Sequence, residues 1–316
     1  MKKGNIYKFI FAILVVGYFL YTSIDTKELK ASVNSIKEEI IKIEEEEELE
    51  EDSEDVGYEA PGLFKVYYLD VGQADSIFIK TDDKNMLIDA GTNASGSKIS
   101  SFLKSINIEK IDYLVATHPH EDHIGGMDDI INDFEIGKFF MPDNYTTTKT
   151  FEDMINALDN KNLKYYVPKI GDEITLGDAD FEVLYLDSKS EDLNDSSIVL
   201  KGIYDDYDFL FMADASSKVE EKLIKEYGED LKSDVLKVGH HGSNTSTSEK
   251  FLEYVKPSYA IISVGKNNKY NHPGKYTLNR INKLNIESYN TSKDGSILVT
   301  CDSKSISVSK VITNTN

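Results

Sequence analysis

Cysteine is almost absent from this chain: Cys301 is the single cysteine among 316 residues. One thiol can form no intrachain disulfide, and it cannot build a zinc site from several thiolates. We expect Cys301 to lie in a strand, where a free cysteine behaves as a small buried apolar side chain. Any metal site in this protein must therefore use imidazole and carboxylate groups.

Positive charge is also scarce, with 35 Lys and Arg against 56 Asp and Glu and a net charge of −21. The deficit is uneven: residues 1–36 carry +3, residues 37–61 carry −11, and residues 62–316 carry the remaining −13. A domain this acidic repels phosphate backbones at long range, which counts against tight non-specific binding of nucleic acid. A local basic patch or a bound metal ion can still reverse the sign at one site.

One long apolar run without charge stands near the start, at Phe9–Ile24, after Lys2, Lys3 and Lys8. As a helix it spans about 24 Å, somewhat less than the ~30 Å hydrocarbon core of a bilayer. We predict a single-pass membrane anchor over residues 1–25, with the preceding lysines in the cytoplasm and the rest of the chain outside. A cleaved signal peptide and a secreted protein are the alternative, disfavoured because no small-x-small cleavage site or lipobox cysteine follows the run.

Residues 26–61 are predicted to form an amphipathic helix and an acidic linker. Apolar residues recur there at coiled-coil spacing: Leu29, Val33, Ile36, Ile40 and Ile43. Only about two heptads are present, so residues 29–43 form either a short amphipathic helix or a weak homodimer contact. The acidic run that follows, residues 44–55, repels itself and is expected to stay solvated and extended as a spacer.

Residues 62–316 predict one α/β domain, because short apolar runs bounded by Gly and Asp alternate with helical stretches. We expect strands over residues 64–69, 76–79, 86–91, 111–116, 197–203, 208–212, 235–238, 260–264 and 297–300. We expect helices over residues 98–106, 218–226, 248–255 and 276–283.

The segment Thr117–Gly126, with the sequence THPHEDHIGG, follows directly after one of these strands. Imidazole nitrogen and carboxylate oxygen are ligands for zinc, manganese or iron, and donors this close together cannot all bind one ion comfortably. Alternate donors suit two neighbouring ions, His118 with His120 and Asp122 with His123. The segment therefore predicts half of a binuclear metal site.

Two other strand ends supply the remaining donors. Asp214 follows the strand expected over residues 208–212, and a carboxylate there can bridge two cations that would otherwise repel each other. His240 and His241 follow the strand expected over residues 235–238. One of the pair is expected to complete the second ion's coordination and the other to face the substrate, with a slight preference for His240 as the ligand.

The HxHxDH pattern resembles the signature of the metallo-β-lactamase superfamily. A narrower resemblance, to the hydrolase domain of the ComEC/Rec2 competence proteins, rests on six ordered motifs: LDVGQAD, THPHEDHIGG, NDSSIVL, MAD, KVGHHGS and SVGKNNKYNHP. The resemblance implies a four-layer αββα sandwich with two divalent metal ions, Zn or Mn. The ligands it implies are His118, His120, Asp122, His123, Asp214 and His240.

One departure from the superfamily pattern concerns the first ion. Members often place another histidine between the first motif and the bridging Asp, and this chain has none between His123 and Asp214. Asn194 stands nearest in order, but a neutral amide is a weak donor to zinc. The ion held by His118 and His120 is therefore expected to bind loosely, to prefer manganese, or to be completed by water and substrate oxygens.

The function implied is that of a metal-dependent hydrolase that attacks phosphodiesters, DNA among them, with a metal-activated water. Asp122, His241 and His272 are the expected catalytic residues; Asn194, Lys237 and Ser243 are expected to hold the substrate. Alternatives are a hydrolase of cell-envelope phosphoesters of the phosphorylcholine type, a lactone hydrolase, and a noncatalytic anchored binding module. The last is disfavoured because a retired site has no physical reason to keep a complete ligand set.

Overall fold

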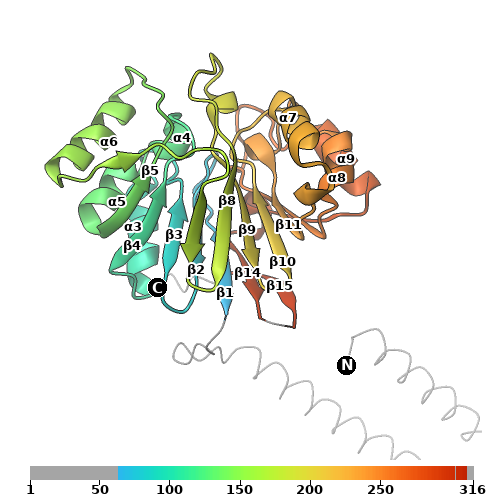
Figure 1. Cartoon of the computed structure of the whole chain (residues 1–316), viewed down its shortest axis with the longest axis horizontal. Helices are drawn as coiled ribbons and strands as arrows, with labels where there is room; N and C mark the ends of the chain where they lie inside the picture. The colour runs from blue at the N-terminus through green and yellow to red at the C-terminus, as the bar shows by residue number, and fades with distance from the viewer. Residues whose placement is uncertain (1–62, 303, 312–316) are drawn as a thin grey trace, which may run out of the picture. The chain divides into compact units, whose positions relative to one another are not determined.

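The computed structural model describes residues 63–302 and 304–311. Two β-sheets pack face to face in this part of the chain, and helices cover their outer faces (Figure 1). The expected α/β sandwich is thereby confirmed. The predicted anchor, the 29–43 seam and the acidic spacer lie outside the described residues. No helix within the described residues combines the length and the apolar character that a bilayer crossing requires.

The first sheet has eight strands among the described residues. Their order is β15 (Ile306–Lys310), β14 (Ile297–Cys301), β1 (Phe64–Tyr68), β2 (Ile77–Lys80), β3 (Asn85–Ile88), β4 (Lys110–Val115), β5 (Glu135–Phe140) and β6 (Tyr165–Tyr166). Strands β3 to β6 pair in parallel, whereas β1 pairs antiparallel with both β2 and β14. The last strands of the chain thus return to the sheet that the first strands began.

The second sheet has seven described strands. Their order is β13 (Glu287–Asn290), β12 (Tyr259–Ile262), β11 (Val235–Lys237), β10 (Tyr207–Phe211), β9 (Val199–Tyr204), β8 (Ala179–Tyr185) and β7 (Glu173–Leu176). Strands β10 to β13 pair in parallel. Because parallel strands end at the same edge of a sheet, the loops after them gather on one side of the domain.

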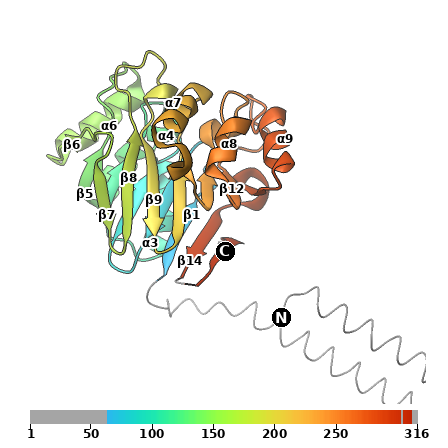
Figure 2. The ribbon, with the colours of Figure 1, turned by 45° about the vertical axis from the view of Figure 1, so that its right-hand side comes forward.

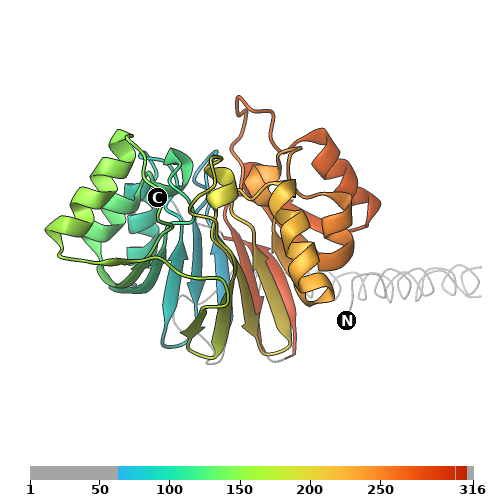
Figure 3. The ribbon, with the colours of Figure 1, turned by 45° about the horizontal axis from the view of Figure 1, so that its top comes forward.

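Helices form the two outer layers, and the view in Figure 3 separates them to either side of the sheets. The first sheet is accompanied by α3 (Gly96–Ser105), α4 (Glu121–Ile124), α5 (Met127–Asp133) and α6 (Lys149–Asn160). The second is covered by α7 (Ser217–Tyr227), α8 (Glu249–Val255) and α9 (Lys275–Lys283), which lie together in Figure 2. The described residues also form short 3₁₀ helices, η1 (Asn194–Ser196), η2 (Gly228–Leu231) and η3 (Gly239–Gly242), and a short α-helix, α10 (Thr291–Asp294).

The described part of the sandwich has three apolar cores, and strand β10 contributes side chains to two of them. Successive side chains of a strand point to opposite faces, so Phe209 and Phe211 enter the core between the sheets while Leu210 packs under the helices. A separate core joins the first sheet to its own helices. Both faces of the central strands are therefore buried, which is why they appear in the sequence as unbroken apolar runs. Cys301 is fully buried in β14, as expected.

Candidate metal centre

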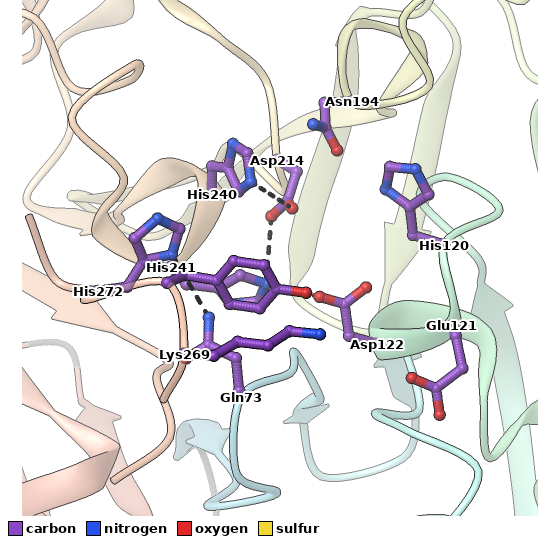
Figure 4. Close-up of a pocket in the computed structure, with 11 residues that line it drawn as sticks. Gln73, His120, Glu121, Asp122, Asn194, Asp214, His240, His241, Lys269 and His272 are labelled. Atoms are coloured by element: carbon purple, nitrogen blue, oxygen red, sulfur yellow. Dashed lines mark hydrogen bonds and ion pairs between the residues drawn. The ribbon is translucent and has the colours of Figure 1, made fainter. Parts of the chain in front are cut away.

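The loops at the strand ends of both sheets enclose a cavity of about 510 Å³ (Figure 4). It is lined by Gln73, His120, Glu121, Asp122, Asn194, Asp214, His240, His241, Lys269, Tyr270 and His272. These residues come from both halves of the sandwich. The histidine motif that the sequence singled out thus forms one wall of a site whose other wall follows the second sheet.

Four side chains at the base of this cavity form a compact donor cluster: Asp122, His123, Asp214 and His241. One ligand atom from each lies within 4.8 Å of all the others. His123 Nε2 is 3.4 Å from Asp214 Oδ1, and His241 Nε2 is 3.4 Å from Asp122 Oδ2. The Nε2 atoms of both histidines and Oδ1 of Asp214 are buried without a hydrogen-bond partner. Buried polar atoms left unpaired are costly, so their convergence on one point fits a bound cation.

Two buried carboxylates behind the cluster orient its imidazoles. Asp89 Oδ2 lies 2.7 Å from Nδ1 of His123, and Asp75 Oδ1 lies 3.3 Å from Nδ1 of His241. The Nδ1 atom of His241 is also 3.0 Å from the carbonyl oxygen of Ser263. A proton held on Nδ1 leaves Nε2 free to bind metal, which is the usual arrangement around ligating histidines.

Neither of these carboxylates was assigned a role from the sequence. Asp89 follows directly after strand β3, and Asp75 ends the LDVGQAD motif just before strand β2. The signal that identified Asp214, a carboxylate at the end of an apolar strand, applies equally to Asp89. Asp75 is harder to recognise, because its partner His241 lies in the other half of the chain.

His118 and His120 lie beside the cluster as a separate pair. His118 Nε2 and His120 Nδ1 are within hydrogen-bonding distance at 3.0 Å, and a cation bound by both imidazoles would take the place of the proton between them. Burial, followed by the neighbouring His123, lowers the pKa of His118 well below its ordinary value, which keeps this imidazole neutral and able to bind metal. Asn194 lines the same cavity, and its Oδ1 is buried without a hydrogen-bond partner (Figure 4). This half of the site therefore has two imidazoles and one amide oxygen.

Left-handed backbone conformations accompany the site residues. Asp89, Ala213, His240 and His241 have φ angles of 60°, 46°, 49° and 52°. Such conformations cost free energy in residues other than glycine and are held only where the surrounding structure fixes them. At the end of β11 two of them occur in succession, and they turn consecutive histidines toward the cavity instead of to opposite sides.

The two consecutive histidines have different surroundings. His241 is buried and belongs to the donor cluster, whereas the side chain of His240 is 25% exposed, with Nε2 3.6 Å from Asp214 Oδ2. The sequence-based preference for His240 as the ligand is therefore not what the geometry favours. Burial and the hydrogen bond from its Nδ1 to the carbonyl oxygen of Ser263 make His241 the better placed metal donor, and His240 faces the open cavity.

Two residues expected to contact the substrate face inward instead. The side chain of Lys237 is fully buried, where Nζ forms a 2.7 Å ion pair with Asp75 Oδ2 and donates to the carbonyl of Val238. This corrects the expectation of substrate contact, since strand alternation turns Lys237 away from the cavity. The hydroxyl of Ser243 bonds Thr245 within the turn after η3, and Ser243 does not line the cavity.

His272, which the sequence predicts to be a catalytic residue, lines the cavity from the loop after β12. Burial and the neighbouring His240 lower the pKa of His272 from 6.5 to about 4, so the imidazole is neutral at neutral pH. Gln73 Nε2 lies 3.5 Å from His272 Nδ1, and Gln73 Oε1 accepts a hydrogen bond from the amide of Gly265. The second bond fixes the amide orientation, so Gln73 donates to Nδ1 and leaves the proton of His272 on Nε2.

The electrostatics of the donor cluster favour bound positive charge. Burial disfavours a charged His241, yet the carboxylates of Asp214 and Asp75 outweigh it and raise the pKa to about 10. Burial likewise opposes ionisation of Asp122, but the interaction with His241, whose Nε2 lies 3.4 Å from Oδ2, and the charge of His123 lower its pKa to about 2. The carboxylates thus stabilise protons on buried imidazoles, and a divalent cation can replace those protons.

Comparison with known proteins gives a family match over residues 69–266, to the metallo-beta-lactamase superfamily. The chain belongs to this superfamily. The match spans the THPHEDHIGG segment, Asp214 and the two consecutive histidines, and it ends before β13, β14 and β15.

Two proteins similar to this chain have names that match the resemblance found in the motifs. The chain is 29% identical over 252 residues to ComE operon protein 3 of Bacillus subtilis, covering 74% of this chain and 32% of that protein. It is 31% identical over 230 residues to competence protein ComA of Neisseria gonorrhoeae, covering 72% of this chain and 31% of that protein. The resemblance to the competence proteins is thereby confirmed, although the matches span only about a third of these relatives' length.

A third similar protein is named as a nuclease and is matched over a shorter segment. Exodeoxyribonuclease WalJ of Streptococcus pneumoniae is 32% identical over 127 residues, covering 38% of this chain and 44% of that protein. Family membership, the sandwich and the buried donor cluster together support a metal-dependent hydrolase of the metallo-beta-lactamase superfamily.

Proposed function

We propose that this protein is a phosphodiesterase that uses two divalent cations, zinc or manganese, and acts outside the cytoplasmic membrane. The observation that carries the proposal is the cluster of Asp122, His123, Asp214 and His241 beside the pair His118 and His120. Three of its donor atoms, Nε2 of both histidines and Oδ1 of Asp214, are buried without a hydrogen-bond partner.

We propose the following ligands for the two ions. Asp122, His123, Asp214 and His241 would hold one cation, and His118 and His120, with the carboxylate of Asp214, would hold the other. Bound divalent cations would supply Lewis acidity, neutralise phosphate charge and make a nucleophile available from water near neutral pH. The amide of Asn194 is a weaker donor than imidazole, which leaves the second position more open to substrate oxygens.

The remaining cavity residues suit a charged ester. The carboxylate of Asp122 is ionised at neutral pH, since its pKa is about 2, so it can accept a hydrogen bond from an attacking water and orient it. His272, neutral and protonated on Nε2, can donate a hydrogen bond to a nonbridging oxygen, as can His240 beside it. Lys269 adds a positive charge to the same cavity. These donors match the several oxygens of a phosphodiester better than the single carbonyl of a lactone.

Similarity supports a nucleic acid as one possible substrate, because a relative bears the name exodeoxyribonuclease. The location outside the membrane is inferred from the charge-free run Phe9–Ile24 and the lysines before it. A weak homodimer through residues 29–43 stays a prediction.

The test uses the full chain, purified in a nonionic detergent. Bound metal is measured, and hydrolysis of bis(p-nitrophenyl) phosphate, single- and double-stranded DNA, phosphorylcholine esters and a simple lactone is assayed. We expect bound metal and diester hydrolysis, with Asp214→Ala losing more than the 10- to 100-fold typical of an outer metal-site partner. The control Asp159→Asn, on the exposed side of α6, should match the wild type.

Each outcome has a clear meaning. A protein that binds no metal and cleaves none of these substrates would overturn the proposal. Cleavage of phosphorylcholine esters without cleavage of other diesters would assign the envelope substrate instead. Lactone hydrolysis alone would contradict a phosphodiester function while leaving the metal centre intact.

A further inference from the structure

The loop between β12 and α9, residues 265–273, stands over one side of the cavity. The Asn268 side chain holds it in shape: Oδ1 accepts from the amides of Tyr270 and His272 at 3.2 and 2.9 Å. Nδ2 of the same side chain donates to the carbonyls of Gly265 and His272 at 2.9 and 2.6 Å. Four hydrogen bonds from one amide fix the course of the loop, so the side chains at its tip are presented in a defined place.

The tip of this loop presents an aromatic ring with a cation beside it. Tyr270 lines the cavity yet remains 53% exposed. Its ring stacks on that of His272, with centroids 5.7 Å apart and planes 28° apart, which fixes the ring next to a candidate catalytic residue. Nζ of the exposed Lys269 lies 4.9 Å from the centroid of the Tyr270 ring. None of these contacts is needed to hold a metal ion.

We propose that Tyr270 and Lys269 form a nucleotide subsite beside the metal centre, in which the Tyr270 ring stacks on an unpaired base and Lys269 binds a neighbouring phosphate. The inference rests on the proposed function and makes its substrate class more specific: single-stranded nucleic acid. An aromatic ring offers every base the same stacking surface, so such a subsite binds without regard to sequence. A base inside a duplex already stacks on both faces and has none free for Tyr270.

Charge distinguishes this occupant from a choline headgroup. A quaternary ammonium group also binds over tyrosine rings, but here the Lys269 ammonium already lies over the ring and would repel a second cation. A nucleotide avoids this repulsion, because its phosphate attracts the Lys269 ammonium while its uncharged base stacks on the Tyr270 ring. In a domain with a net charge of −13, this lysine places a positive charge at the cavity, where it can attract a phosphate.

The chain contains no tryptophan, so Tyr270→Trp creates a single fluorescent reporter at the subsite. The full-length variant, loaded with Mn²⁺ or Zn²⁺, is titrated with hydrolysis-resistant phosphorothioate oligothymidylate. We expect saturable quenching, weaker quenching by the same length of duplex, and none by phosphorylcholine. The control Tyr276→Trp places the reporter at a position that is 65% exposed on α9 and does not line the cavity, and should not be quenched. Equal responses of the two reporters, or equal quenching by single strand and duplex, would overturn the inference.

Kinetics give a second readout. Tyr270→Ala should raise KM for a single-stranded oligonucleotide about tenfold or more, the cost of losing one stacked base, with a smaller change in kcat. Tyr270→Phe keeps the ring and should stay within about twofold of the wild type. The ratio of kcat/KM for the oligonucleotide to kcat/KM for bis(p-nitrophenyl) phosphate should fall in Tyr270→Ala and Lys269→Gln and hold in Tyr276→Ala. Equal losses on both substrates would contradict a nucleotide subsite. Absence of all hydrolysis would instead reject the proposed function, and the fluorescence titration would still decide whether the subsite binds.

Discussion

Lys237 and Asp75 form a 2.7 Å ion pair with both side chains buried, and the same aspartate reaches Nδ1 of His241 with its other oxygen. The pair joins strand β11 of the second sheet to the loop before β2 of the first. Lys237 does not line the cavity. It acts on the site through Asp75, which positions the imidazole of His241.

Breaking this pair should destabilise the domain strongly. Lys237→Met leaves the Asp75 carboxylate buried without its cation, for which we expect a loss of about 3–5 kcal/mol in the free energy of unfolding. The double variant Lys237→Met/Asp75→Asn should lose less than the sum of the single variants, because it removes both charges. Denaturant titration measures this, with the exposed Lys266→Met as the control. Strict additivity would show that the two side chains do not interact.

Substitution of His240 and of His241 should have different effects on the amount of metal that the protein retains. We expect His241→Ala to retain much less metal than wild type after dialysis against a chelator, because it removes a donor of the buried cluster. His240→Ala should retain most of its metal and lose activity, since His240 faces the cavity. Elemental analysis beside a diester assay checks both variants. The reverse pattern of metal loss would restore His240 as the ligand.

A histidine introduced at position 194 should strengthen the weaker half of the centre. Asn194 lines the cavity beside His120 with a buried Oδ1 that has no hydrogen-bond partner. Asn194→His replaces this amide by a better zinc donor, so we expect more zinc to be retained per chain in competition with a chelator. Asn194→Ala is the matched control and should retain no more than wild type. Equal zinc retention by Asn194→His and wild type would place the third donor elsewhere.

The single cysteine should report global unfolding with a marked pH dependence. Burial raises the pKa of Cys301 from 9.0 to about 12. The neutral thiol is thus favoured in the folded state; its contribution to stability is complete below pH 9 and is lost as the pH rises toward 12. At pH 9 about one folded thiol in a thousand is ionised, so alkylation should be far slower in folded than in urea-unfolded protein. Iodoacetamide labelling followed by mass spectrometry measures both rates, and rapid labelling of folded protein at pH 8 would contradict the burial.

Much of the fold could be predicted because the central strands are buried on both faces. Strand β10, with Phe209 and Leu210 on opposite sides, has the unbroken apolar run that such burial requires. Strand β5 has no such run, since its residues are mostly exposed or half-exposed, and it was not predicted. Helix α6 was also missed, although Phe151, Met154 and Leu158 recur at helical spacing. The helical spacing of apolar residues is present in α6, but none of the site motifs lies next to it.

The site was predictable where its residues are close in sequence or end an apolar strand. Asp122 and His123 are neighbours, and Asp214 follows β10. The role of Lys237 was not predictable, because motif position gives no information on which face of β11 a side chain occupies. The choice between His240 and His241 depends on two successive left-handed residues, a conformation that no pattern in this sequence indicates.

The division of donors between the two sheets has a consequence for folding. His118, His120, Asp122 and His123 follow β4, whereas Asp214 and His241 follow β10 and β11. Neither group alone completes the cluster, so tight metal capture has to wait until both halves of the chain have docked. Coordination then cross-links segments about a hundred residues apart, and such a link disfavours the open chain by restricting loop closure. Retained metal is thus a measure of completed assembly as well as of catalytic readiness.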